Sequence, residues 1–336
     1  MPKCGTQICI CDLPIRYDTY TGCTHACRYC FVQRKTDISN IELGETPESL
    51  LKFIKGERNN KTRWCDWNIP IHFGGMSDPF QPAEAHYKRT LEALKIFEAT
   101  QYPVVISTKG KLCIEDEWLS VLKNCNVVMQ ISMACSTYDQ LEKGAPTFEE
   151  RLHMAKVLSE NVPRVIARCQ PYLHECFDEI MKNIPRMAES GIYGVIFEAM
   201  KFVKKKNGLV KVGGDYTYPV EVLKNDFTRL KEQCHKYGIK FYAGENRLRT
   251  MGDSLTCCGI DGLEGFTPNK FNGNHLLNGE KIEASEGMKK TGCSQCFKSL
   301  YQDTIYTRFC KDKTFEELML LELQPNSNTR KALGKE

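Results

Sequence analysis

Short apolar runs alternate along the chain with longer stretches in which apolar side chains recur at helical spacing. Continuous apolar runs of this length are typical of strands that are buried on both faces of a parallel sheet. They predict strands at 15–21, 69–73, 104–108, 127–133, 164–169, 194–198 and 240–243. The helical stretches lie between them, at 47–53, 83–99, 115–122, 147–159, 176–188 and 220–237. This alternation predicts an α/β fold with parallel strands and right-handed crossovers, as an open or closed barrel.

Polar and glycine residues follow several of these predicted strands. In α/β barrels, reacting groups lie at the carboxyl ends of the strands. The groups at such ends are a cysteine loop after 15–21, then Gly74, Gly75 and Met76, Ser107 to Lys109, Ser132, Arg168 and Glu198. The glycine pair is explained equally well by a tight turn or by close approach of a ligand. Asp78 precedes the helix at 83–99 and Glu84 lies at its start, and both are interpreted as capping groups.

The composition is that of a folded globular protein. The 336 residues are 41% hydrophobic and 26% charged, with no internal repeat. No apolar window of about 18 residues could span a bilayer, and the N-terminus lacks a signal pattern, so we expect a cytoplasmic protein with no membrane partner. In that reducing compartment, 18 cysteines point to metal ligands more than to disulfides. The formal charge of +4 permits a nucleic-acid partner without requiring one.

The cysteine loop has the spacing Cys23-x3-Cys27-x2-Cys30. A four-iron cluster is normally held by four thiolates, so this loop leaves one iron free for a ligand other than the protein. Electron-transfer ferredoxins end a similar run with a fourth cysteine and a proline, whereas Phe31 follows Cys30 here. The loop therefore predicts a [4Fe-4S] cluster at which chemistry takes place.

A second set of cysteines lies toward the C-terminus, at Cys257, Cys258, Cys293, Cys296 and Cys310. The pair Cys293-x2-Cys296 could present two sulfurs to one metal, and the others could complete a second [4Fe-4S] cluster or a zinc site, or stay unligated. The N-terminal Cys4, Cys9 and Cys11 could close over the first cluster, join another site or simply fray. We divide the chain into an N-terminal cysteine-containing segment (1–14), a barrel (15–245) and a cysteine-rich extension (246–336).

The cysteine loop resembles the cluster-binding motif of radical S-adenosylmethionine enzymes. The later motifs resemble the spore photoproduct lyase-like branch of that superfamily: Phe73-Gly-Gly-Met-Ser-Asp-Pro-Phe-Gln-Pro82, Ile106-Ser-Thr-Lys109, Gln130-Ile-Ser-Met133 and Glu142-Lys-Gly-Ala-Pro-Thr-Phe-Glu-Glu-Arg151. The resemblance covers roughly residues 15 to 200. It implies a partial (β/α)6 TIM-like barrel of the radical SAM type, followed here by the cysteine-rich C-terminal extension.

The resemblance also implies an activity. The open iron would bind S-adenosylmethionine, and an electron from a donor such as flavodoxin or ferredoxin would cleave it to a 5′-deoxyadenosyl radical that abstracts hydrogen from substrate. Position by position, Gly74, Gly75 and Met76 would approach the methionyl amino group, and Lys109 its carboxylate. Ser132 would contact ribose or carboxylate, Tyr29 would lie near adenine, and Arg168 joins the candidate cofactor-binding residues.

One departure from the branch concerns its substrate. Photoproduct lyases carry a hydrogen-donating cysteine in the segment that corresponds to residues 74–78, where this chain has none. Cys135, after the strand at 127–133, is the candidate replacement in catalysis or else a buried structural thiol. The missing cysteine argues against repair of a thymine dimer. The branch resemblance still allows nucleic-acid repair or modification as one alternative function, and a non-catalytic iron–sulfur or electron-transfer protein is another.

Overall fold

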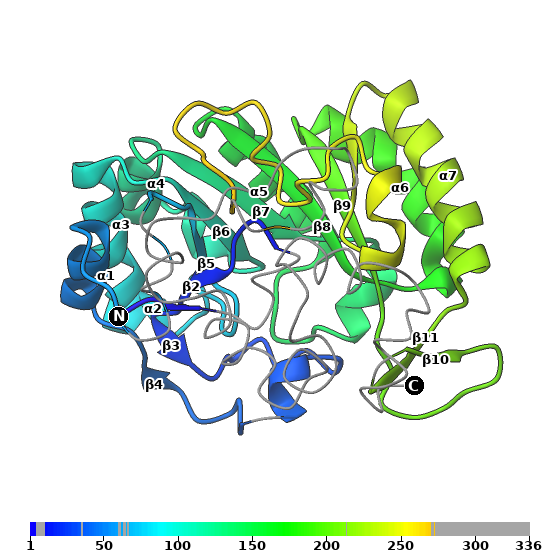
Figure 1. Cartoon of the computed structure of the whole chain (residues 1–336), viewed down its shortest axis with the longest axis horizontal. Coiled ribbons are helices and arrows are strands. Elements are labelled where there is room, and N and C mark those ends of the chain that lie inside the picture. Colours follow the sequence, from blue (N-terminus) through cyan, green and yellow to red (C-terminus); the bar gives the residue numbers. More distant parts are fainter. Residues whose placement is uncertain are drawn as a thin grey trace, which may run out of the picture.

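An eight-stranded sheet forms the centre of the protein (Figure 1). The computed structural model describes residues 1–4, 11–34, 36–59, 62, 65, 67–212, 214–269 and 272. Seven strands run parallel, and β1 joins the edge antiparallel to β2. Their order is β1 (Lys3–Cys4), β2 (Ile15–Tyr17), β5 (Ile71–Phe73), β6 (Val104–Thr108), β7 (Val127–Ser132), β8 (Arg164–Tyr172), β9 (Gly194–Ala199) and β12 (Lys240–Ala243).

The spatial order of the parallel strands follows the chain, so each strand–helix unit adds to the same edge of the sheet. The helices that connect them lie around the outside (Figure 1): α1 (Pro47–Ile54), α3 (Arg89–Thr100), α4 (Asp116–Leu122), α5 (Phe148–Ser159), α6 (Phe177–Glu189) and α7 (Val220–Lys236). Among the described strands, β1 and β12 are the sheet's edges, so the sheet is an open barrel. This architecture confirms the predicted α/β fold of the partial TIM-barrel type.

Two predicted elements are divided. The strand at 15–21 stops after Tyr17, and the separate β3 (Tyr20–Thr21) pairs with β4 (Glu42–Leu43). The helix at 83–99 breaks into α2 (Glu84–Tyr87) and α3 at Lys88, whose φ is 53°. The buried Glu84 carboxylate accepts hydrogen bonds from the first amides of α3, Thr90 N at 2.8 Å and Leu91 N at 2.9 Å. This side chain therefore caps the second helix, as expected of a capping group.

The inner face of the sheet is covered by chain from both ends of the sequence. One apolar cluster joins its strand residues (Val105, Val128, Ile166, Ile196 and Tyr242) to Leu13 and to Cys258, Ile260 and Phe266. The latter three follow β12 and the 3-10 turn η5 (Asn246–Met251). The larger core lies between the sheet and its outer helices. No described helix is long and apolar enough to cross a membrane.

Candidate functional site

The cysteine loop follows β3 directly. Gly22 opens it with a φ of 78°, and a Cβ at this position would lie 2.3 Å from Asn40 O, so only glycine fits. Cys27 is buried, and Cys23 and Cys30 are half-buried. Burial raises the pKa of the Cys23 thiol to about 12 and that of Cys27 to about 11. A metal ion that bound these thiols would have to displace their protons at neutral pH.

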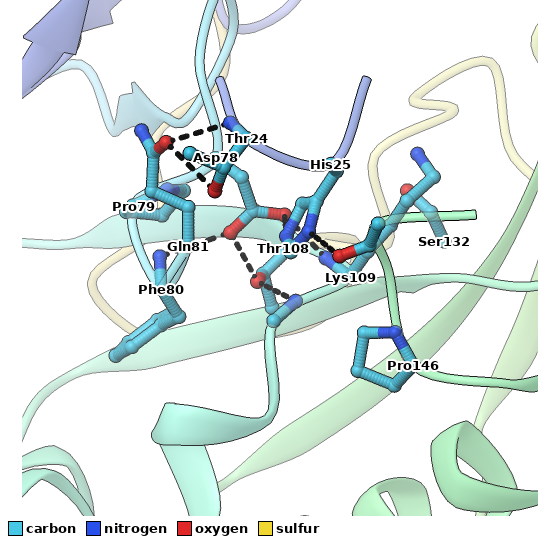
Figure 2. Close-up of polar contacts among 12 residues, drawn as sticks. Thr24, His25, Asp78, Pro79, Phe80, Gln81, Thr108, Lys109, Ser132 and Pro146 are labelled. Atoms are coloured by element: carbon cyan, nitrogen blue, oxygen red, sulfur yellow. Dashed lines mark hydrogen bonds and ion pairs between the residues drawn. The ribbon is translucent and has the colours of Figure 1, made fainter. Parts of the chain in front are cut away.

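Asp78 fastens this loop to the end of β6 (Figure 2). His25 Nε2 lies 3.2 Å from Asp78 Oδ2, and His25 Nδ1 lies 2.9 Å from Gly144 O. Asp78 also accepts hydrogen bonds from Thr108 Oγ1 at 2.7 Å and from Lys109 N at 2.6 Å. Burial would raise the pKa of Asp78, but His25 and these donors hold it at about 2. The ionised carboxylate joins two of the motifs predicted to converge.

The segment 74–76 lies beside the end of β6. Gly74 has a φ of 87°, and a Cβ there would lie 2.5 Å from Ser107 O, so this glycine is required by conformation and by space. Met76 N donates to Asp18 Oδ1 at 2.8 Å. Because an amino group is a hydrogen-bond donor, it would be bound through the carbonyl oxygens of this segment. The observed backbone is compatible with that role for Gly74, Gly75 and Met76.

Lys109 and Tyr29 meet at a buried carboxylate, Glu142. Tyr29 Oη donates to Glu142 Oε1, and Lys109 Nζ lies 3.9 Å from the same oxygen and 5.9 Å from the Tyr29 ring centroid. Arg151 forms an ion pair with the other oxygen of Glu142 and donates to Ser132 O at 2.7 Å. Since Arg151 already balances Glu142, the charge of Lys109 is available to a second anion. Burial lowers the pKa of Lys109, which adds to the advantage of such a partner.

Arg168 belongs to a row of polar side chains at the ends of β6, β8 and β9. It donates to Ser107 Oγ at 2.5 Å and to Gln170 Oε1 at 3.0 Å, and Gln170 donates to Glu198. The guanidinium is therefore bonded to neutral oxygens, and the nearest carboxylate in the row is reached through Gln170. Its part in cofactor binding stays a prediction.

Cys135 comes after β7, at the start of η3 (Ser136–Gln140). Its side chain is 1% exposed, and a hydrogen bond with Cys176 together with burial raises its pKa. Cys176 ends η4 (His174–Cys176), which follows β8. The structure thus places the thiol in a buried cysteine pair, and its role as a hydrogen donor stays a prediction.

The second cysteine set is only partly described. Cys257 and Cys258 follow η5, and Cys11 packs against the same apolar cluster as Cys258. The remaining members, Cys293, Cys296 and Cys310, lie outside the described residues. Within the described part of the chain, no three Cys, His, Asp or Glu side chains are grouped as they would be around a metal ion, and this includes the loop Cys23–Cys30.

Two carboxylates that organise the site were not among the predicted site residues. The sequence pattern favours a helix-capping role for Asp78, whereas the structure shows it binding the cysteine loop and the end of β6. Glu142 collects Tyr29, Lys109 and Arg151. Asp78 and Glu142 each lie inside a motif that resembles the spore photoproduct lyase-like branch. That resemblance was the signal in the sequence that could have identified them as site residues.

Comparison with known sequences gives distant relatives. No protein-family model matches the chain. Uncharacterized proteins of Mycobacterium bovis and Mycobacterium tuberculosis are 25% identical over 197 residues, which are 54% of this chain and 58% of theirs. The match therefore spans little more than half the length of these relatives.

Comparison with solved structures gives a closer likeness in shape. A spore photoproduct lyase with bound S-adenosylmethionine and a dinucleoside spore photoproduct superposes with a TM-score of 0.56 at 17% identity, covering 69% of this chain and 76% of the lyase. SuiB of Streptococcus suis, bound to its precursor peptide SuiA, superposes with a TM-score of 0.54 at 14% identity, covering 72% of this chain and 51% of SuiB. At these identities the likeness shows a shared fold.

Proposed function

We propose that this chain, which has the fold of the radical S-adenosylmethionine enzymes, cleaves S-adenosylmethionine reductively and abstracts hydrogen from a substrate. The observation that carries the proposal is the attachment of the three-cysteine loop to two strand-end motifs through the buried Asp78 and Glu142. A loop that served only to fold the chain would not need two acidic side chains held in the interior, because burying charge is costly.

The residues at this end of the sheet have distinct roles in the proposal. When bound, the cluster and S-adenosylmethionine supply the electron and the radical chemistry. Cys23, Cys27 and Cys30 would hold the cluster. Lys109 would bind the carboxylate of the cofactor, and Tyr29 would lie near its adenine.

The experiment is anaerobic reconstitution with iron and sulfide, followed by dithionite and S-adenosylmethionine, with 5′-deoxyadenosine measured by chromatography. We expect product from the wild-type chain and none from Cys27→Ala. The matched control is Cys234→Ala, which removes a fully buried thiol of α7 far along the chain from the loop. A reconstituted wild-type protein that forms no 5′-deoxyadenosine would end the proposal. In the cell, we expect flavodoxin or ferredoxin to supply the electron.

Nucleic acid is the second candidate substrate, favoured by the hairpin of β10 (Val210–Val212) and β11 (Asp215–Thr217). The turn before it carries the exposed run 203–206, Val-Lys-Lys-Lys. Arg34, four residues after Cys30, donates to Asp215 Oδ1 at 2.7 Å and to Lys201 O at 3.0 Å, so the hairpin is joined to the cysteine loop. The similar lyase was solved with a dinucleoside photoproduct.

Salt titration of DNA binding tests this candidate. Neutralised phosphates make the logarithm of the binding constant fall with the logarithm of salt concentration, by roughly 0.7 to 0.9 per phosphate contact. We expect replacement of Lys204, Lys205 and Lys206 by alanine to reduce that slope by about two to three. The control replaces the exposed Lys52 and Lys55 of α1 and should leave the slope unchanged. Binding that does not depend on salt would argue for a different substrate.

A further inference from the structure

Arg16 of β2 has a guanidinium without a partner in the part of the chain that the structure describes. The side chain makes no hydrogen bond or ion pair there, and its Nε is buried with no acceptor. The nearby acid, Asp18, accepts hydrogen bonds from the amides of Met76 at 2.8 Å and Ser77 at 3.4 Å instead. Burial raises the pKa of Asp18 although Arg16 opposes this, so Asp18 is a poor counter-charge. A charge held out of water without a partner is unfavourable, and Arg16 is therefore available to an anion.

The Arg16 side chain lies beside the His72 ring and the glycine segment. Arg16 pairs with His72 across β2 and β5, and His72 pairs with Val105 of β6, a member of the inner apolar cluster. Paired positions share a face of the sheet, so Arg16 and His72 also face inward. A Cβ at Gly75 would lie 3.0 Å from Arg16 Cδ and 3.7 Å from His72 Nδ1. The unpaired cation therefore lies at the inner face, next to the segment 74–76.

A second guanidinium, that of Arg168, is linked to the same histidine through one hydroxyl group. Ser107 Oγ lies 2.8 Å from His72 Nε2 and accepts from Arg168 Nη1 at 2.5 Å. The other hydrogen bonds of Arg168 go to Gln170 Oε1, a neutral oxygen. Burial lowers the pKa of Arg168, although Glu198 opposes this. Two cationic side chains therefore lie on either side of the hydrogen-bonded pair of His72 and Ser107.

The His72 ring contributes a hydrogen-bond acceptor to this group. Gln130 Nε2 donates to Cys258 O at 2.8 Å, so Gln130 Oε1 is the atom that accepts from Ser107 Oγ at 2.9 Å. Because the single hydroxyl hydrogen of Ser107 is used there, His72 Nε2 must donate to Ser107, and His72 Nδ1 keeps a lone pair. Burial lowers the pKa of His72 to about 3, so the ring is neutral.

Neither guanidinium forms an ion pair with a carboxylate in the described part of the chain. Glu198, the carboxylate of the row that contains Arg168, is paired with Lys201 at 2.8 Å, and Glu142 is paired with Arg151. S-Adenosylmethionine would not supply the missing charge, because its sulfonium and ammonium groups outnumber its carboxylate. The inner face therefore has an excess of positive charge that a further anion would balance.

We propose that Arg16 and Arg168 bind an anionic group of the substrate, a carboxylate or a phosphate, at the inner face of the sheet. Guanidinium groups suit these oxyanions because their N–H donors match two oxygens at once. The lone pair of His72 Nδ1 would accept from a hydroxyl or N–H group next to the anion. The assignment of the anion to the substrate rests on the proposed function, whereas binding of the anion does not.

Equilibrium dialysis of the full-length, reconstituted protein tests the site. The probes are labelled inorganic phosphate in one arm and labelled acetate in the other, at constant ionic strength. We expect saturable binding of at least one probe, weakened about tenfold or more by Arg16→Met and by Arg168→Met. The matched control is Arg186→Met, because the exposed Arg186 pairs with Glu149, and it should bind like the wild type. The probe that binds more tightly identifies the group as phosphate or carboxylate.

Urea unfolding separates binding from a structural role of Arg16. Because Arg16 makes no hydrogen bond among the described residues, Arg16→Met leaves no group unpaired and should not lower the free energy of unfolding without an anion. The probe that binds should raise the free energy of unfolding of the wild type and leave that of Arg16→Met unchanged, since a ligand stabilises only the state that binds it.

Three results would overturn the inference. They are the absence of saturable binding of either probe, equal binding by the wild type and both variants, and a loss of affinity for S-adenosylmethionine in step with the loss of affinity for the anion. The last result would make the two arginines cofactor ligands. Formation of 5′-deoxyadenosine by Arg16→Met would show that cleavage of the cofactor is intact, so failure of the anion site can be told from failure of the proposed function.

Discussion

His25 Nε2 lies 3.2 Å from Asp78 Oδ2, with 2% of the His25 side chain and 8% of the Asp78 side chain exposed. The histidine lies between the first two cysteines of the loop, and the aspartate follows β5. The pair therefore fixes the loop to the sheet at its centre, whereas the ends of the loop are fixed by backbone hydrogen bonds such as Cys23 N to Ile38 O at 2.8 Å.

Asp78→Asn should weaken both the fold and the first cluster site. Loss of one partner of a buried pair costs about 3 to 5 kcal/mol, and the freed loop should lose iron. Iron per chain and urea unfolding are the measurements. Asp253→Asn is the control, because Asp253 pairs with the half-exposed His235 at 2.8 Å. Equal iron retention by the two variants would refute this role of Asp78.

Glu142→Gln should destabilise the protein by about 3 to 5 kcal/mol, since it leaves the charge of Arg151 buried and unpaired. Combining it with Arg151→Met should recover much of the loss, because the remaining charge is then also removed. Urea denaturation of the single and double variants measures the coupling. The control is Glu149→Gln, which breaks the exposed Glu149–Arg186 pair and should cost less than about 1 kcal/mol. Additive losses at Glu142 and Arg151 would contradict the pairing.

Gly74→Ala should be more destabilising than Gly208→Ala. Both glycines have positive φ, 87° and 80°, but a Cβ at Gly74 meets Ser107 O and Pro79, whereas at Gly208 nothing lies within 4 Å. Gly208→Ala therefore carries only the backbone strain, about 1 kcal/mol, and Gly74→Ala should cost at least about 1 kcal/mol more. Thermal unfolding of the two variants gives the difference. Similar melting temperatures would mean that the segment 74–76 moves freely.

Lys109→Met should reduce the affinity of the reconstituted protein for S-adenosylmethionine by about tenfold or more, equivalent to about 1.4 kcal/mol. The physical reason is the loss of a buried cation. Glu142 pairs with Arg151 and lies 3.9 Å from Lys109 Nζ, so it only partly balances the charge of Lys109. Equilibrium dialysis with labelled cofactor is the measurement, and the exposed Lys111→Met is the control. An unchanged dissociation constant would remove Lys109 from the binding site.

His72 should make the protein less stable in acid. Burial, with Arg168 and Arg16 nearby, lowers its pKa from 6.5 to about 3. Between these two pKa values His72 is protonated in the unfolded chain and neutral in the folded chain. Its contribution to the free energy of unfolding is therefore fully present above about pH 6.5 and is lost as the pH falls toward 3. The loss attributable to this group is of the order of 2 to 4 kcal/mol. Urea unfolding across this range should be flatter in His72→Gln, and parallel pH profiles would disprove the assignment.

The strands of the sheet could be predicted because the residues within each strand carry the pattern that identifies it. A run such as Val104–Thr108 is buried along its whole length, so its apolar pattern alone identifies it. A site could be predicted only where a residue type has distinctive chemistry, and the cluster ligands expected in the cysteine loop stay a prediction. The partners of Asp78 and Glu142 depend on segments far apart in the sequence, and no local pattern states that a carboxylate will meet a histidine or a lysine there.

The packing of Cys11 against the apolar cluster that contains Cys258 was beyond sequence reasoning for the same cause. The sequence allowed three alternative roles for the N-terminal cysteines. Tertiary contacts likewise decided that the first predicted strand ends after Tyr17 and that the predicted helix 83–99 divides at Lys88. At Lys88 the deciding contact is the hydrogen bonding of Glu84 to the amides of Thr90 and Leu91.

The clasp between the two ends of the chain has a consequence for biosynthesis. Asn272 Nδ2 donates to Asp12 Oδ1 at 2.9 Å and Asn269 N donates to Asp12 O at 3.2 Å, so the inner face of the sheet is covered by residues that the ribosome makes after every strand of the sheet. A nascent chain that has reached β12 can pair its strands while that face is still open. The described cover of this face of the sheet therefore reaches its place late in synthesis, after the strands that it covers have been made.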